Sequence, residues 1–213
     1  NVQGTENIIC ACKTNSVRKL IFTSSPSVVF GDASLEGVDE SIPYPEKYLC
    51  DYPFTKALAE KMVLQANGNL LSTVAIRPHL IWGPGDPHLV PRLLDKAQKN
   101  KLVQVGDGEN KVDIIYIDNA VSAHLLACKA LEGDTNISGK AYFVSDGEPV
   151  VLWDWINQLL RQMNKSNVSR KISYNNALRL GTFLEGIYGL FGIKREPPMT
   201  RFLASQLARS HYF

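Results

Sequence analysis

The sequence has no long hydrophobic run, no strong charge imbalance and no secretion signal. No stretch approaches the roughly 18 uninterrupted apolar residues that a membrane-spanning helix needs, and the first residues do not follow the pattern of a signal peptide. The 23 basic and 21 acidic side chains nearly cancel, so the chain lacks the basic field typical of nucleic-acid-binding proteins. These absences predict a soluble, cytoplasmic protein without a nucleic-acid partner.

The chain also lacks the spacings typical of metal ligands and disulfides. Its four cysteines and four histidines are Cys10, Cys12, Cys50, Cys128, His79, His88, His124 and His211, and no two cysteines form a CxxC pair. Cys10 and Cys12 are two residues apart on a predicted helix, so their side chains diverge by about 200° and cannot share a bond or a metal ion. We therefore expect reduced thiols and no metal site.

What the sequence does contain is an alternation of predicted helices and strands. Helices are expected over residues 1–14, 52–65, 89–99, 119–131, 152–163 and 175–213, the last one broken by Pro197-Pro198. Strands are expected over residues 19–24, 73–77, 102–106, 113–117 and 141–145. Asp118 is expected to cap the helix over 119–131. Alternating helices and strands in the first part of the chain predict a parallel α/β sheet, followed by a more helical appendage.

Tyr52 and Lys56 give the sharpest chemical signal. Residues four apart lie on one face of a helix, one turn from each other. An ammonium group held there favours the phenolate, which suits the tyrosine to give a proton to a carbonyl oxygen or to take one from an alcohol. The spacing alone is common by chance, and two solvated residues on a helix are the alternative interpretation.

A run of hydroxyl groups at the end of the preceding strand strengthens this signal. Ser24 and Ser25 follow the strand over 19–24 at its carboxyl end, where open α/β sheets bind ligands. A serine at this position can donate to a substrate carbonyl and stabilise the charge that develops on its oxygen. The alternative is that both serines only cap the loop. A serine after the strand, followed by a tyrosine and a lysine on the next helix, is much less common by chance than the Tyr–Lys spacing alone.

Several segments together resemble the extended short-chain dehydrogenases, and within them the 3β-hydroxysteroid dehydrogenase branch. They are residues 1–5, 19–25, 28–31, 52–56, 59–60, 77–85, 116–119 with His124, 139–146 and 197–201. Residues 27–30, 44–45 and 77–91 look particularly like bacterial members that reduce 2-alkyl-3-ketoalkanoic acids.

The resemblance implies an α/β fold that is the C-terminal part of a Rossmann-like parallel sheet, with a smaller, mostly helical substrate-binding region. Residues 1–85 would form the C-terminal half of the NAD(P)-binding domain. Residues 86–213 would mainly form the substrate-binding region, with 113–131 returning to the Rossmann core. The family's glycine fingerprint is missing upstream, and the G-x-x-G-x-x-G string at 186–192 has the wrong context for a phosphate cradle. We therefore expect a chain that is cut at both ends and inactive by itself.

The resemblance also implies the roles of five residues. Tyr52 would be the acid/base group and would also contact the cofactor. Lys56 would tune the tyrosine and bind the nicotinamide ribose, and Ser25 rather than Ser24 would bind the substrate oxygen. Pro78 and His79 would line the nicotinamide site of NAD or NADP, with His79 acting through its backbone.

The expected reaction is hydride transfer between NAD or NADP and the β-hydroxy or β-keto group of a hydrophobic substrate, such as a 3-ketoalkanoic acid or a sterol-like molecule. A nucleotide-sugar epimerase or dehydratase of the same fold is the alternative, although residues 23–26 contain no carboxylate. A non-catalytic cofactor-binding protein is the alternative of another class. The apolar stretch over 178–191 is expected either to line the substrate or to pack an ordinary helical core. We also expect that residues 183–193 contact a membrane peripherally and that the protein is a homodimer.

Overall fold

The computed structural model describes residues 1–133 and 136–213. The α-helices of this part of the chain are α1 Val2–Thr14, α2 Asp51–Gln65, α3 Leu89–Gln98, α4 Ile117–Ala130, α5 Leu152–Gln162, α6 Tyr174–Leu190 and α7 Arg201–Ala208. A 3-10 helix, η1, spans Pro26–Val29. The strands are β1 Lys19–Thr23, β2 Leu35–Glu36, β3 Ser72–Pro78, β4 Ile81–Trp82, β5 Gln104–Val105, β6 Lys111–Val112, β7 Ile115–Tyr116, β8 Lys140–Val144, β9 Val150–Val151, β10 Lys171–Ile172 and β11 His211–Tyr212.

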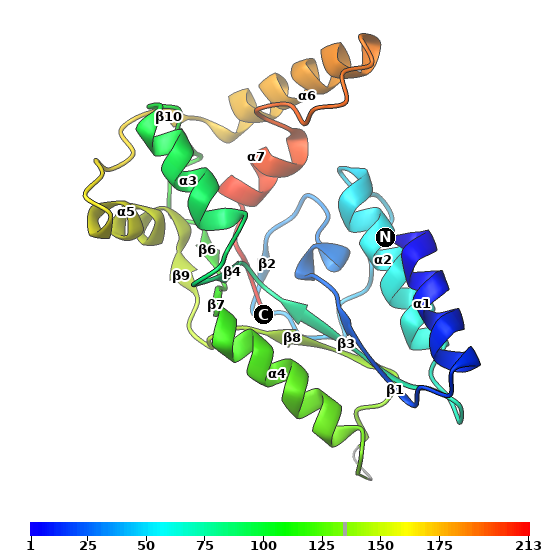
Figure 1. Ribbon diagram of the computed structural model, residues 1–213. Coiled ribbons are helices and arrows are strands. Elements are labelled where there is room, and N and C mark those ends of the chain that lie inside the picture. Colours follow the sequence, from blue (N-terminus) through cyan, green and yellow to red (C-terminus); the bar gives the residue numbers. More distant parts are fainter. Residues whose placement is uncertain (134–135) are drawn as a thin grey trace.

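Three parallel strands in the order β1-β3-β8 form the main sheet. β3 lies in the middle, and its residues from Thr73 onward are buried, as expected for a parallel strand covered on both faces. α1 and α2 lie on one side of this sheet and α4 on the other (Figure 1). The predicted parallel α/β sheet is therefore confirmed.

The second region consists of short strands and the helices α3, α5, α6 and α7, which lie beside the main sheet (Figure 1). Its core contains Val105, Val112, Leu152, Ile156 and Leu160, all buried. The strand expected over 102–106 is reduced to β5, and the strand expected over 113–117 is reduced to β7. Strands of two residues are too short to show a hydrophobic alternation, so the sequence pattern placed them only approximately.

The last residues of the chain form a strand where the sequence pattern predicts a helix. β11 lies between β2 and β6 and runs parallel to both, so that His211 pairs with Leu35 and with Val112. The ring of Phe213 stacks on that of Phe143 in β8, with centroids 4.0 Å apart. The prediction of a helix over 175–213 is wrong at this end, because partners far away in the sequence determine the conformation.

The start of α4 also differs from the prediction. The helix begins at Ile117, with Tyr116 at the N-cap position and without a side-chain cap, so the prediction that Asp118 caps it is wrong. Asp118 lies in the first turn instead, where a negative charge is still favourable. The Asp146 carboxylate takes over the capping task, because it accepts hydrogen bonds from the Tyr116 N–H at 3.0 Å and from Asn119 Nδ2 at 2.8 Å.

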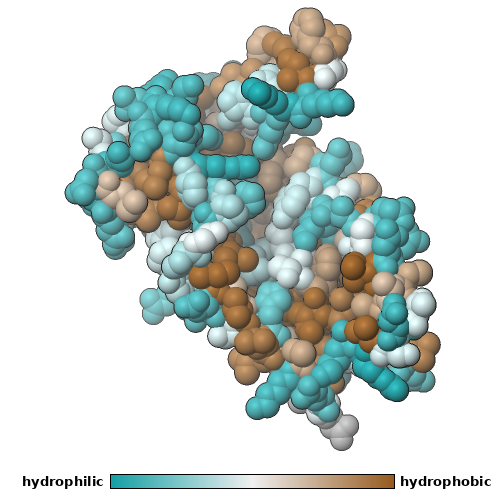
Figure 2. Space-filling model, in the orientation of Figure 1, coloured by the Kyte–Doolittle hydropathy of each residue, from teal (hydrophilic) through white to brown (hydrophobic). Residues whose placement is uncertain are grey.

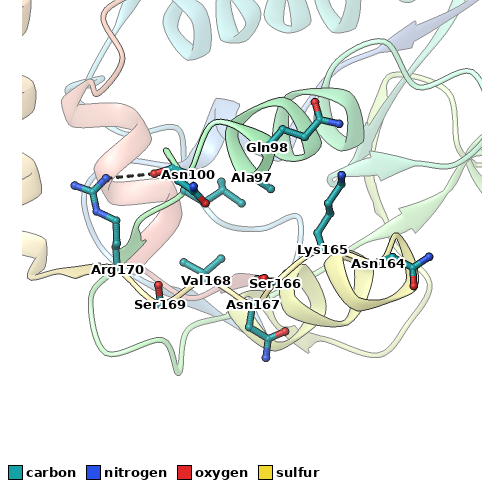
Figure 3. A pocket seen from close by; sticks show the side chains of 11 residues that line it. Ala97, Gln98, Asn100, Asn164, Lys165, Ser166, Asn167, Val168, Ser169 and Arg170 are labelled. Carbon is teal, nitrogen blue, oxygen red and sulfur yellow. Dashed lines mark hydrogen bonds between the residues drawn. The ribbon is translucent and has the colours of Figure 1, made fainter.

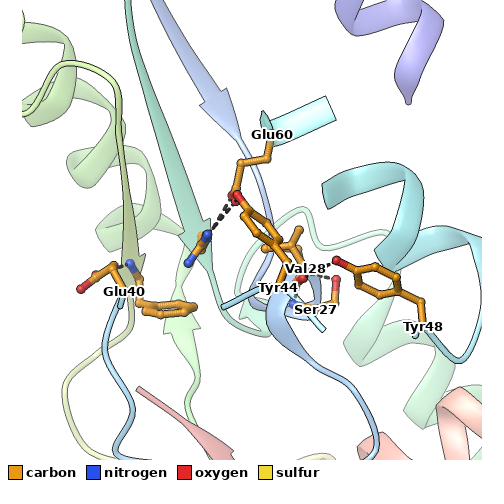
Figure 4. Close-up of polar contacts among 9 residues, drawn as sticks. Ser27, Val28, Glu40, Tyr44, Tyr48 and Glu60 are labelled. Atoms are coloured by element: carbon orange, nitrogen blue, oxygen red, sulfur yellow. Dashed lines mark hydrogen bonds and ion pairs between the residues drawn. The ribbon is translucent and has the colours of Figure 1, made fainter. Parts of the chain in front are cut away.

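A buried ion pair joins α2 to β3 (Figure 4). Arg77 donates from Nε and Nη2 to the two carboxylate oxygens of Glu60, at 3.0 and 2.6 Å, and the Tyr44 hydroxyl donates to the same carboxylate at 2.6 Å. The side chains of Arg77 and Glu60 are only 4% and 0% exposed. The guanidinium group also lies 4.9 Å from the centre of the Phe143 ring. Since water reaches neither charge, each depends on the other, and the pair holds the helix on the strand.

We predict that Glu60→Gln lowers the free energy of unfolding by about 3–5 kcal/mol, because it leaves the Arg77 charge buried and unpaired. The double variant Glu60→Leu with Arg77→Met should recover most of this loss, since no charge then stays buried. Urea unfolding of the complete protein measures both effects. Lys99→Ala, which breaks the exposed ion pair with Asp95, is the matched control and should change the stability by less than about 1 kcal/mol. A Glu60→Gln loss as small as that of the control would contradict the prediction.

Candidate active site

Lys56 reaches from α2 to the carboxyl end of β1. Its Nζ donates to the Thr23 carbonyl at 2.7 Å and lies 4.6 Å from the centre of the Phe22 ring. Partial burial lowers the pKa of Lys56, and the nearby Glu60 carboxylate opposes this shift. An ammonium group has three N–H donors, so two remain after the bond to Thr23.

Tyr52 stands one turn before Lys56 and is 50% exposed. Within the described residues, its hydroxyl forms no hydrogen bond. Its carbonyl accepts from Thr55 Oγ1 at 3.1 Å, and Thr55 Oγ1 in turn accepts from Asn1 Nδ2 at 2.9 Å. The first turn of α2 is thus tied to the start of α1, while the phenol group stays accessible.

Ser25 caps η1, which agrees with the loop-capping interpretation of its position. Its Oγ accepts from the Ser27 N–H at 3.2 Å and from the Ser27 hydroxyl at 2.9 Å. A hydroxyl group has two acceptor lone pairs and one proton. Because Ser27 fills both lone pairs, Ser25 keeps its proton for donation to another group. The neighbouring Ser24 Oγ is buried and has no hydrogen-bond partner in the described part of the chain.

His79 is buried, and both nitrogens of its ring face other protein groups. Its Nδ1 contacts the Asp113 carbonyl, and its Nε2 lies 2.9 Å from Nδ1 of His211. Its backbone N–H donates to the Val144 carbonyl at 3.3 Å, directly after the pairing of Pro78 with Val144. Neither ring nitrogen is therefore available to exchange a proton with a substrate, and a role as a wall of the nicotinamide site stays a prediction.

The structure brings three of the predicted residues to one end of the main sheet. Ser25 follows the end of β1, Lys56 bonds to that strand end, and Pro78 ends the neighbouring parallel strand β3. The sequence analysis did not identify Thr23, whose carbonyl holds Lys56. Every residue offers a carbonyl, so no residue type could have indicated this role.

The described part of the structure contains cavities near and away from the candidate site residues. One, of about 270 Å³, is lined by residues 81–89 and Ile117, and it begins two residues after His79. Another, of about 370 Å³, lies between the end of α3 and the segment after α5 (Figure 3). The polar side chains of Asn100, Ser166 and Arg170 line this second cavity. None of the candidate site residues lines it.

The parallel sheet, with serine and lysine at the carboxyl end of one strand and an accessible tyrosine one helical turn away, defines a protein of the extended short-chain dehydrogenase class. The sequence model of the 3-beta hydroxysteroid dehydrogenase/isomerase family matches residues 1–173. The chain belongs to this family, as its sequence motifs predict.

Three similar proteins illustrate the relationship. The 2-alkyl-3-oxoalkanoate reductase of Stenotrophomonas maltophilia is 46% identical over 215 residues, which cover 100% of this chain and 65% of the relative. The decarboxylating sterol-4-alpha-carboxylate 3-dehydrogenase of Mus musculus is 37% identical, with 100% and 60% covered. The structure of UDP-glucuronic acid 4-epimerase from Bacillus cereus in complex with NAD is 26% identical and has a TM-score of 0.64, with 79% of this chain and 54% of that chain covered. The chain thus spans less than two thirds of the length of these proteins.

The buried histidines predict that the protein loses stability in acid. Burial lowers the pKa of His79 to about 3 and also lowers the pKa of His211. The unfolded chain takes up these protons near pH 6.5 and the folded protein does not, so stability should fall as the pH drops from about 6.5 toward about 3. His79→Gln should flatten this slope by up to about 1.4 kcal/mol per pH unit.

Urea unfolding of the complete protein at several values between about pH 7 and pH 5 measures this difference. Taking the difference between the two proteins removes the contribution of carboxylates that both share. The prediction would be wrong if the free energy of unfolding fell equally with pH in the original protein and in the His79→Gln variant. His79 would then have the same pKa in the folded and the unfolded protein.

Proposed function

We propose that this chain is the catalytic part of an oxidoreductase that uses NAD or NADP. The enzyme would move hydride between the nicotinamide and the β-hydroxy or β-keto group of a hydrophobic substrate, such as a 3-ketoalkanoic acid or a sterol-like molecule. The observation that carries this proposal is the Lys56 ammonium bonded to the Thr23 carbonyl beside Ser25, with Tyr52 accessible one turn away. The names of the two relatives, a reductase of 3-oxoalkanoates and a 3-dehydrogenase of sterols, support the substrate class.

The residues at this end of the sheet fit a nicotinamide cofactor. Lys56 keeps two N–H donors, which suit the hydroxyl groups of a ribose. Pro78 and His79 stand at the end of the adjacent strand, at the edge where open parallel sheets bind ligands. When bound, the nicotinamide supplies or accepts the hydride.

Tyr52 and Ser25 donate to the substrate oxygen, and Lys56 assists Tyr52. Tyr52 gives its proton to the oxygen when a ketone is reduced, and takes the proton back when an alcohol is oxidised. The Lys56 ammonium favours the negative phenolate that remains. Ser25 donates a hydrogen bond to the same oxygen and keeps its proton, and the two hydrogen bonds that it accepts from Ser27 strengthen it as a donor.

The lack of a free carboxylate next to Ser25 argues against the dehydratase part of the alternative. Dehydratases need a further acid/base group near the serine, and the first carboxylate after Ser25 belongs to Asp32. It accepts hydrogen bonds from the Tyr174 hydroxyl at 2.6 Å and from Ser205 Oγ at 3.0 Å. Asp32 therefore holds the second region in place, which favours a reductase over a dehydratase.

We predict that Tyr52→Phe in the complete protein lowers turnover by about 10²–10⁴-fold and leaves the affinity for the cofactor unchanged, because only the ionisable oxygen is lost. Lys56→Met should reduce both, and should move the alkaline limb of the pH–rate profile upward. Ser25→Ala should lower turnover by roughly 10²–10³-fold, since one donor to the oxygen is lost. Absorbance of the reduced cofactor with 3-keto acids and sterols measures turnover, and equilibrium titration measures cofactor affinity. A Tyr52→Phe enzyme that keeps more than about a tenth of normal turnover would refute the assignment.

We also propose that the far end of α6 contacts a membrane surface peripherally. Phe183, Leu190 and Phe191 are 64%, 81% and 72% exposed, and the surface is hydrophobic where this helix projects from the molecule (Figure 2). Lys194 and Arg195 follow after Gly192 and Ile193, and such cations close to an apolar surface suit anionic headgroups. Within the described residues, no helix is long and apolar enough to span a bilayer.

Sedimentation with anionic phospholipid vesicles tests this contact. Leu190→Ser combined with Phe191→Ser should abolish binding of the complete protein to the vesicles and leave turnover of a water-soluble substrate intact. Leu125→Ser with Leu126→Ser removes two apolar residues of α4 that are each 66% exposed and should leave vesicle binding unchanged. Equal loss in both double variants would refute a specific role of α6.

The expected homodimer and the expected cytoplasmic location are retained as proposals. Light scattering of the complete protein in solution tests the first, and cell fractionation tests the second.

A further inference from the structure

Thr23 is held from two sides at the end of β1. Its carbonyl accepts from Lys56 Nζ at 2.7 Å, and its Oγ1 lies 2.9 Å from Nε2 of His124. Lys56 belongs to α2 and His124 to α4, which lie on opposite sides of the main sheet (Figure 1). Three elements far apart in the sequence therefore meet at one residue.

The contact of His124 with the Ala120 carbonyl determines which ring nitrogen donates and which accepts. Its Nδ1 lies 2.7 Å from the Ala120 carbonyl, one turn earlier on α4. A carbonyl only accepts, so Nδ1 carries the ring proton, and Nε2 of the neutral ring is an acceptor. The Thr23 hydroxyl consequently donates to Nε2, which holds the Thr23 side chain in one orientation.

The strand end that His124 holds carries two parts of the proposed active site. The Ser24 N–H donates to the Ile76 carbonyl at 2.7 Å, and this bond continues the pairing of β1 with β3 just past Thr23. Ser25 follows directly. A displacement of the main chain at Thr23 would therefore move the acceptor of Lys56 and the hydroxyl of Ser25 together.

We propose that His124 is a positioning residue of this site. By accepting a hydrogen bond from the Thr23 hydroxyl it holds the end of β1, and so sets the positions of the Lys56 ammonium and the Ser25 hydroxyl. It acts through Thr23 and contacts neither cofactor nor substrate. The inference rests on the proposed function, in which Lys56 binds the cofactor and Ser25 donates to the substrate oxygen.

The first test needs no cofactor and no turnover. Nitrogen-15 NMR of the histidine rings in the complete protein should show His124 with its proton on Nδ1 and a hydrogen bond accepted at Nε2. Thr23→Val should shift the Nε2 signal toward that of a free acceptor and leave Nδ1 protonated. A His124 ring protonated at Nε2 would overturn the inference.

The second test measures the effect on the site. His124→Leu and Thr23→Val should each weaken cofactor binding by roughly two- to tenfold, the loss expected from one ordinary hydrogen bond, and move the alkaline limb of the pH–rate profile upward. The double variant should be no worse than the larger single effect, because both changes remove the same bond. His124→Gln, whose amide oxygen can accept near the position of Nε2, should restore most of the affinity.

Two controls separate positioning from a general loss of structure. Ser122→Ala changes an exposed residue of the same helix and should leave affinity and pH profile unchanged. A purely structural role of His124 would lower the urea midpoint without moving the alkaline limb. If His124→Leu does not fold, Thr23→Val decides the question, since valine keeps the shape of threonine.

The outcomes also separate this inference from the proposed function. If Lys56→Met weakens cofactor binding while His124→Leu and Thr23→Val leave the affinity and the alkaline limb unchanged, the inference is overturned and the function stands. If Lys56→Met itself leaves cofactor affinity unchanged, the proposed role of Lys56 fails, and the inference fails with it.

Discussion

Burying an ion pair removes two charges from water, and the structure around Glu60 and Arg77 compensates both charges, although Arg77 Nη1 stays buried without a hydrogen-bond partner in the described residues. The carboxylate accepts from Arg77 and Tyr44, and the Phe143 ring covers the guanidinium group. Glu60 shares one face of α2 with Lys56 and Tyr52, since the three are spaced four residues apart. This face is buried at Glu60 and exposed at Tyr52. The fixed end of the helix thereby determines where the accessible end presents its phenol group.

The same ion pair connects the main sheet to the end of the chain. Phe143 lies between Arg77 and Phe213, so the last residue of the chain packs against the ring that covers the ion pair. Two residues earlier, His211 contacts the ring of His79 at the end of β3. The wall predicted for the nicotinamide therefore rests on a strand that follows the entire second region. A displacement of the second region would therefore also displace His79, because closely packed side chains transmit displacement.

The sequence predicts the long elements well because their patterns repeat over several turns or residues. α2 and β3 agree with the predicted ranges within two residues. β11 could not be predicted, because two residues show no periodicity and His211 pairs with Leu35 far upstream. In the site, spacing indicates the pair of Tyr52 and Lys56, and the strand end indicates a serine, but only the family resemblance selects Ser25 over Ser24. The contact between Thr23 and His124 joins residues 101 positions apart, and no local pattern encodes such a contact.

The balance of hydrogen-bond donors and acceptors at the end of β1 favours one type of reaction over another. Ser25 has both lone pairs occupied by Ser27, and Lys56 has only N–H groups to offer. Residues 23–31 contain no carboxylate. Reduction of a ketone places negative charge on an oxygen, which such donors stabilise. Removal of a proton from carbon would instead require a basic acceptor, and a base other than Tyr52 would have to come from outside this segment. A site built from donors therefore suits carbonyl–alcohol interconversion better than elimination.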